Sequence, residues 1–77
     1  MYLNVVVHTP VGTVRGSLAG TPAPMKELEQ LRDTIQTNPE RLTYVVVFCG
    51  DAEILVPGEV FMKSVTEFRI EDKPFNG

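Results

Sequence analysis

Two segments of the chain are apolar on both faces of the strand that each one predicts. Residues 44–49 are apolar throughout, and residues 3–7 are interrupted only by Asn4. A strand with one wet face alternates apolar and polar residues, whereas a strand covered on both faces is an unbroken apolar run. Both segments therefore predict strands of a sheet whose second face is covered by something.

The N-terminal part of the chain predicts a β-hairpin followed by a helix. Residues 2–8 and 13–18 are joined by a Thr-Pro-Val-Gly turn signal, and Gly16 inside the second strand indicates a bulge or a close backbone approach. Thr21 and Pro22 suit a helix start, and Pro39 ends the helix near Thr37. One apolar stripe follows the helix, at Met25, Leu28, Leu31 and Ile35.

The C-terminal half predicts a second hairpin and a last strand. Residues 44–49 turn at Gly50-Asp51 into residues 52–56, residues 59–63 favour a single helical turn that plugs one end of the core, and residues 64–70 alternate as a strand. The predicted fold is a single small α+β domain over residues 1–72, an antiparallel sheet of about five strands with one helix on one face (β-β-α-β-β-β). Residues 73–77 are expected to be a flexible tail.

One helix can cover only one face of this sheet. The expected inward set is Leu3, Val5, Val7, Val14, Leu18, Val45, Val47, Ile54, Val56, Phe68 and Ile70. The opposite face then holds Tyr2, Val6, Tyr44, Val46, Phe48, Leu55 and Val65, an apolar patch that would be unusual on a soluble monomer. We expect another copy of the chain to cover it, through Tyr44, Val46, Phe48, Val6 and Leu55. The alternative is a sheet that curls into a partial barrel and covers itself.

Composition strengthens the case for self-association. A chain of 77 residues is near the lower end of what folds alone, and such domains often need a disulfide, a metal or a partner subunit. One cysteine and one histidine allow neither an internal disulfide nor a structural zinc site, so no metal or cofactor is expected. A homodimer or higher oligomer is the remaining means of stabilisation.

Charge and hydropathy narrow the classes of partner and the location. The net charge is −3, and the seven basic residues form no cluster, so general nucleic-acid binding is not expected. The sequence shows no stretch long enough to span a membrane and no secretory signal pattern, so membrane association is not expected. A cytoplasmic, reducing location fits the lone thiol.

Candidate chemistry is sparse. His8 is the only histidine, and histidine is the residue type best suited to acid–base chemistry, but its sequence neighbours offer only threonines, so a solvated histidine at a strand end is the favoured interpretation. Cys49 lies in no CxxC or Cys-His-Asn motif and is interpreted as a small apolar residue. We therefore expect no enzyme; an active site assembled between subunits around His8 or Cys49 is the alternative. Ligand or partner binding is expected at Tyr2, Arg15, His8 and Arg69.

The segment from residue 52 to residue 70 resembles a pattern in short phage and prophage accessory proteins. A strand ends in proline, a small turn supplies a valine and a bulky apolar residue, and a final strand contains Ser-Val. The residues that carry the resemblance are Ile54, Val56, Pro57, Val60, Phe61, Ser64, Val65, Phe68 and Ile70. The resemblance implies a viral setting in which very small proteins bind host components, often to disable antiviral defences.

Two functions of different classes follow. The first is a non-catalytic phage-type protein that self-associates through its sheet and blocks a bacterial host protein, such as a defence component, in the host cytoplasm. The second is an oligomeric sponge that binds a nucleotide-like immune signal at subunit interfaces, where Tyr2, Tyr44, Arg15 and Arg69 would stack on the ligand and neutralise its charge. A structural role in the virion also fits the sequence.

Overall fold

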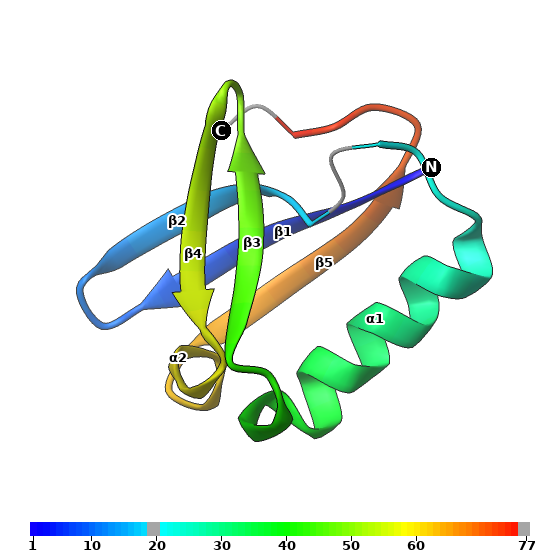
Figure 1. The fold of residues 1–77 in the computed structure, drawn as a ribbon. Helices are drawn as coiled ribbons and strands as arrows, with labels where there is room; N and C mark the ends of the chain where they lie inside the picture. Colours follow the sequence, from blue (N-terminus) through cyan, green and yellow to red (C-terminus); the bar gives the residue numbers. More distant parts are fainter. Residues whose placement is uncertain (19–20, 76–77) are drawn as a thin grey trace.

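The structure is a computed structural model that describes residues 1–18 and 21–75, and it confirms the α+β class. A five-stranded antiparallel sheet has the order β4-β3-β2-β1-β5, with one main helix (Figure 1). The elements in chain order are β1 (Tyr2–Thr9), β2 (Gly12–Ser17), α1 (Met25–Thr37), the 3-10 turn η1 (Pro39–Arg41), β3 (Tyr44–Cys49), β4 (Ala52–Pro57), α2 (Gly58–Met62) and β5 (Val65–Glu71).

The sheet bends sharply between β2 and β3. These two strands are paired only at Ser17 and Phe48, and Figure 1 shows the β3–β4 hairpin running steeply across the other three strands. Gly16 permits this crossing, because a Cβ atom there would overlap the Phe48 carbonyl and the Val47 side chain. The close backbone approach predicted at Gly16 is therefore confirmed. We call β1, β2 and β5 the three-strand wall, and β3 and β4 the two-strand wall.

The core lies between the two walls and the helix. Val5 and Val7 of β1 share one cluster of buried side chains with Val45 and Val47 of β3 and with Ile35 of α1. Most of the predicted inward set is buried or packed against this cluster, because side chains alternate along each strand. The exceptions are Ile54 near the end of the β3–β4 hairpin, which is 36% exposed, and Ile70, which is half-buried outside this cluster. The curled sheet thus encloses its own inner face with help from α1.

Helix α1 begins later than predicted. Pro24 has the extended angles φ −59° and ψ 144°, and the helix starts at Met25 rather than at Pro22. Pro24 disfavours a helical residue before it, and the N–H of Ala23 instead donates to the Met1 carbonyl at 2.9 Å. Met25 is consequently 49% exposed and is not part of the buried stripe. Leu28 and Ile35 are buried as predicted.

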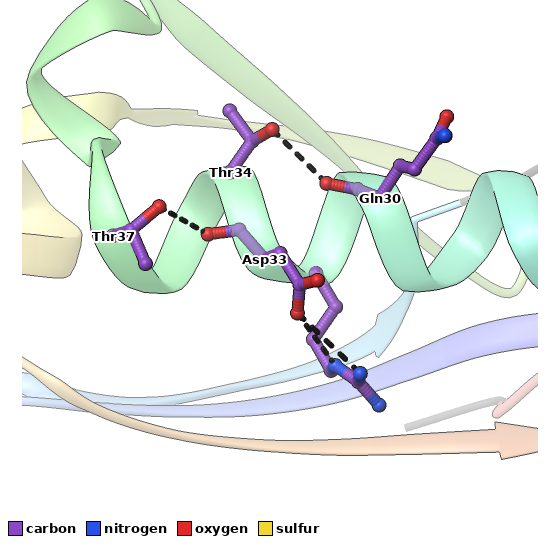
Figure 2. Close-up of polar contacts among 5 residues, drawn as sticks. Gln30, Asp33, Thr34 and Thr37 are labelled. Carbon is purple, nitrogen blue, oxygen red and sulfur yellow. Dashed lines mark hydrogen bonds and ion pairs between the residues drawn. The ribbon is translucent and has the colours of Figure 1, made fainter.

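The C-terminal half of α1 carries local polar contacts on its solvent side. The hydroxyl groups of Thr34 and Thr37 donate to the carbonyl oxygens of Gln30 and Asp33, at 3.0 and 2.6 Å (Figure 2). Arg32 forms an exposed ion pair with Asp33 at 3.4 Å. The predicted helix end at Thr37 is confirmed, and η1 follows at once. These contacts order the helix end and create no pocket of their own.

The short helix α2 closes one end of the core, as predicted. Phe61 is 7% exposed and belongs to the core cluster. Helix α2 packs against η1 so closely that a Cβ atom at Gly58 would overlap the carbonyl oxygens of Pro39 and Leu42. This contact connects the end of α1 with the start of β5.

Candidate binding groove

The C-terminal segment folds back over the outer face of the three-strand wall. Asn4 is 3% exposed, and its side-chain amide donates to Glu71 Oε1 and to the Lys73 carbonyl, both at 2.9 Å. Its Oδ1 atom accepts the backbone N–H of Phe75, also at 2.9 Å. Lys73–Phe75, predicted to belong to a flexible tail, is thus held against β1; residues 76 and 77 of that predicted tail lie outside the described residues.

This segment and the wall beneath it form an open groove of about 670 Å³. Strand β1 supplies Asn4, Val6 and His8, β2 supplies Arg15, and β5 supplies Glu67, Arg69 and Glu71. The C-terminal segment supplies Asp72, Lys73, Pro74 and Phe75. Apolar side chains therefore lie beside several charged ones in the same depression.

Strand register brings the charged residues together from distant parts of the chain. Val6 is paired with Arg15 on β2 and with Glu67 on β5, so the two charges flank one apolar side chain. Asn4 is paired with Arg69, one step further along the same face of β1. Alternation puts all of these side chains on the face opposite the core.

His8 and Glu67 form an ion pair within the groove. His8 Nε2 and Glu67 Oε2 are 2.9 Å apart, with side-chain exposures of 44% and 59%. The hydrogen bond from His8 holds the pKa of Glu67 below its ordinary value, helped by the charges of Arg69 and Arg15 and opposed by desolvation. Near neutral pH the carboxyl of Glu67 is therefore ionised, and its Oε2 atom is hydrogen-bonded to His8.

Two arginines of the groove lack an ion-pair partner among residues 1–18 and 21–75, whereas two of its carboxylates are hydrogen-bonded. Glu67 is bonded to His8, and Glu71 accepts a hydrogen bond from Asn4. Across residues 1–18 and 21–75, the ion pairs are His8–Glu67 and Arg32–Asp33, so neither Arg15 nor Arg69 has an ion-pair partner there. An entering group would consequently find two guanidinium groups available beside Val6.

The structure brings together three of the four residues expected to bind a ligand or partner. His8, Arg15 and Arg69 line the groove, whereas Tyr2, at the start of β1, does not. Of the residues expected to mediate self-association, Val6 also lines the groove. The other four lie together on the outer face of the two-strand wall, where Tyr44 and Leu55 are 59% and 60% exposed and Val46 and Phe48 are half-buried.

Sequence reasoning missed most of the groove residues, among them Asn4, Lys73 and Phe75. Asn4 gave a local signal, because it is the one polar residue within an apolar run and a buried amide requires partners. Lys73 and Phe75 gave none, because their role depends on where the chain turns after β5. Nothing local in the sequence indicates the contact between Glu67 and His8, because β1 and β5 lie at opposite ends of the chain.

The groove can bind and orient a ligand, and it contains no assembled nucleophile. Cys49, the other candidate for chemistry, is half-buried at the end of β3 and does not line the groove. Within the described part of the chain, no group of His, Cys, Asp and Glu side chains is arranged to hold a metal ion. None of the helices described there has the length and hydrophobicity needed to cross a membrane. The chain matches no protein-family model, no curated protein and no solved structure.

Proposed function

We propose that this chain is a non-catalytic binding protein that self-associates through its sheet and receives a partner in the groove of the three-strand wall. The observation that carries the proposal is the convergence of Arg15, Arg69 and His8 on one groove from three different strands. Arginine and aromatic side chains beside a half-buried apolar floor are typical of binding hot spots. Val6 and Phe75 supply the apolar part here.

The partner's contact group is expected to be acidic. Arg15 and Arg69 have no ion-pair partner among residues 1–18 and 21–75, while the carboxylates of Glu67 and Glu71 already accept hydrogen bonds from His8 and Asn4. A guanidinium group binds a carboxylate through two parallel hydrogen bonds, which fixes orientation as well as adding affinity. A carboxylate or phosphate entering the groove would satisfy both arginines.

The class of partner that we propose is a bacterial host protein, with defence components as the first group to examine. This part of the proposal rests on the resemblance of residues 52–70 to short phage and prophage accessory proteins. Binding in the groove would then block the host protein sterically, in the bacterial cytoplasm.

A capture experiment tests the proposal directly. Tagged protein is incubated with bacterial lysate, and retained proteins are identified by mass spectrometry for the wild type, Arg15→Glu and Arg41→Glu. Arg41 is exposed on η1 and does not line the groove, so the control makes the same charge change elsewhere. We expect a protein that is retained by the wild type and by Arg41→Glu and lost by Arg15→Glu. Equal retention by all three would contradict the proposal.

A second candidate function is capture of a nucleotide-like ligand, favoured by the size of the groove. Small-molecule sites commonly enclose about 300–1,000 Å³, and the volume here is about 670 Å³. Arginine side chains can pair with phosphates and stack on bases. Tyr2 and Tyr44, expected to stack on such a ligand, do not line the groove, so Phe75 is the aromatic residue available in one chain.

Thermal shift separates the two functions. A sponge should be strongly stabilised by one member of a panel of linear and cyclic nucleotides, because a ligand that binds only the folded state raises its melting temperature. The same nucleotide should not stabilise Arg15→Glu. A panel without any shift, together with specific protein capture, would favour the first function.

A further inference from the structure

Strand β5 is an edge of the sheet and is regular over its whole length. It pairs with β1 from Val65 to Glu71 without a break in register, and in the strand order no strand follows it (Figure 1). The strand contains no proline, the residue that commonly protects an edge from further pairing. Its inward residues Thr66, Phe68 and Ile70 are only half-buried. Within residues 1–18 and 21–75, no further strand therefore covers the outer backbone of this edge, and its inner side contacts α1.

The backbone groups that point to the open side can be identified. In an antiparallel strand, successive residues direct their N–H and C=O groups alternately to the two neighbouring strands. The Leu3 carbonyl accepts the N–H of Leu18 on the β2 side at 2.8 Å, so Asn4, Val6 and His8 direct theirs to β5. Their partners on β5 are Arg69, Glu67 and Val65. The groups of Thr66, Phe68 and Ile70 consequently point outward, and the hydrogen bonds within residues 1–18 and 21–75 give them no partner there.

The charges of β5 are complementary to those of a second β5 in one full-length register. A two-fold axis through Phe68 pairs two copies antiparallel over the whole strand, with Phe68 opposite Phe68 and Thr66 opposite Ile70. All outward-pointing backbone groups are then hydrogen-bonded. On the outer face, Glu67 of each copy lies directly opposite Arg69 of the other, at a position without backbone hydrogen bonds, where side chains are closest.

Other registers are worse. An axis through Arg69 opposes Arg69 to itself and Glu67 to Glu71, and an axis through Glu67 opposes Glu67 to itself, so each brings like charges together. An axis through Ile70 pairs Arg69 with Glu71, but it shortens the overlap, because β5 ends at Glu71. The charge pattern of β5 therefore permits two copies to pair and favours one register over the others.

The other edge of the sheet lacks these features. Strand β4 has a single charged residue, Glu53, so no register can oppose unlike charges. It ends in Pro57, which has no N–H to donate. The two edges are thus distinguished by sequence as well as by position.

We propose that two copies of this chain pair through their β5 edges about a two-fold axis at Phe68, with reciprocal Glu67–Arg69 contacts between the copies. The inference rests on the self-association part of the proposed function, and it names a surface different from the Tyr44–Leu55 face of the two-strand wall. The pairing joins two sheets into one continuous sheet and places the two grooves side by side on its outer face. Such an edge contact buries little surface, so a weak dimer is expected.

Charge reversal with complementation tests the pairing. Sedimentation equilibrium is measured under reducing conditions, from about 1 µM to about 1 mM, for the wild type, Glu67→Arg, Arg69→Glu and an equal mixture of the two variants. Each variant alone opposes like charges twice in its homodimer, so its dimer dissociation constant should rise at least about tenfold. In the mixture, one chain has arginine at both positions and the other has glutamate at both. Each cross-strand contact then opposes unlike charges again, and dimers should return.

The sedimentation experiment can either support or overturn the pairing of two β5 strands. Restored association in the mixture supports the pairing, with circular dichroism showing that each variant is folded. A wild type that stays monomeric at about 1 mM, or a mixture that associates no better than its components, would overturn it. Arg41→Glu on η1, outside β5 and outside the two-strand wall, is the control and should leave this dimer intact. Failure of the complementation says nothing against groove binding, which is measured independently with Arg15→Glu.

Discussion

The outer faces of the two walls differ in what covers them. On the three-strand wall, the chain's own C-terminal segment returns over β1, Asn4 is buried, and a charged groove remains. On the two-strand wall, Tyr44 and Leu55 stay largely exposed beside half-buried Val46 and Phe48. Both walls contain a strand whose sequence is apolar on both faces. The same sequence signal therefore has two outcomes in one small domain.

The difference teaches that an apolar second face does not by itself indicate a partner. On β1, Asn4 anchors the C-terminal segment of the same chain. This segment is 71 positions from Asn4 in the sequence at Phe75. For β3 and β4, none of the described residues performs that task, and the apolar face is left for association. A single polar residue within the strand distinguishes the two cases.

The largest effect is expected where the two walls join. Gly16→Val should lower the free energy of unfolding by about 3 kcal/mol, because the new side chain would overlap the Phe48 carbonyl and the Val47 side chain. Urea denaturation measures the change. Thr13→Val, an exposed position on the same strand, is the control and should change stability by less than about 0.5 kcal/mol. Equal stability of both variants would mean that the crossing tolerates a side chain.

Next in size is the loss of the anchor on the three-strand wall. Asn4→Ala should cost about 2 kcal/mol, because it removes the bonds to Glu71, to the Lys73 carbonyl and to the Phe75 N–H. The C-terminal segment should then detach, and the amide hydrogen of Phe75 should exchange much faster. Hydrogen exchange measured by NMR reports this directly. Unchanged exchange at Phe75 would show that the segment is held by something other than Asn4.

A smaller effect on stability is expected on the two-strand wall. Leu55→Asp should change the free energy of unfolding by less than about 0.5 kcal/mol, because the side chain is exposed. It should remove association through this wall, leaving dimers where the wild type forms larger assemblies at the same concentration. Sedimentation velocity resolves the species. An unchanged distribution would mean that the apolar face of this wall is not a contact between copies.

The smallest effect concerns the exposed pair in the groove. The pKa of Glu67 is lowered in the folded protein by His8, so its contribution to stability is present above the ordinary glutamate pKa and is lost as the pH falls through the lowered value. Glu67→Gln should therefore lower the melting temperature slightly near neutral pH and have less effect below about pH 4. Calorimetry across this range measures it. A difference that grows in acid would contradict the assigned sign.

Local patterns in the sequence predict most of the elements and their inward faces. Turn signals at Gly12 and Gly50 fixed the two hairpins, and both glycines have positive φ in the structure. Alternation fixed which side of each strand is buried, and the plug at Phe61 followed from a short apolar turn after Pro57. These features are local, since each depends on residues within a few positions of one another. The predicted start of α1 was wrong because both Pro22 and Pro24 suit the beginning of a helix. The helix starts after the second of them, since Pro24 disfavours a helical residue before it.

The groove, by contrast, results from the pairing of strands that are distant in sequence. Arg15 and Glu67 are distant in sequence, and they meet across Val6 because β1 lies between β2 and β5 in the sheet. No local pattern specifies that β5 pairs with β1, since this pairing depends on burying Phe68 and Ile70 beside Val5 and Leu3 after the whole chain has turned. The return of Lys73–Phe75 to Asn4 has the same origin. Long-range strand pairing, rather than any motif, positions the residues proposed to bind.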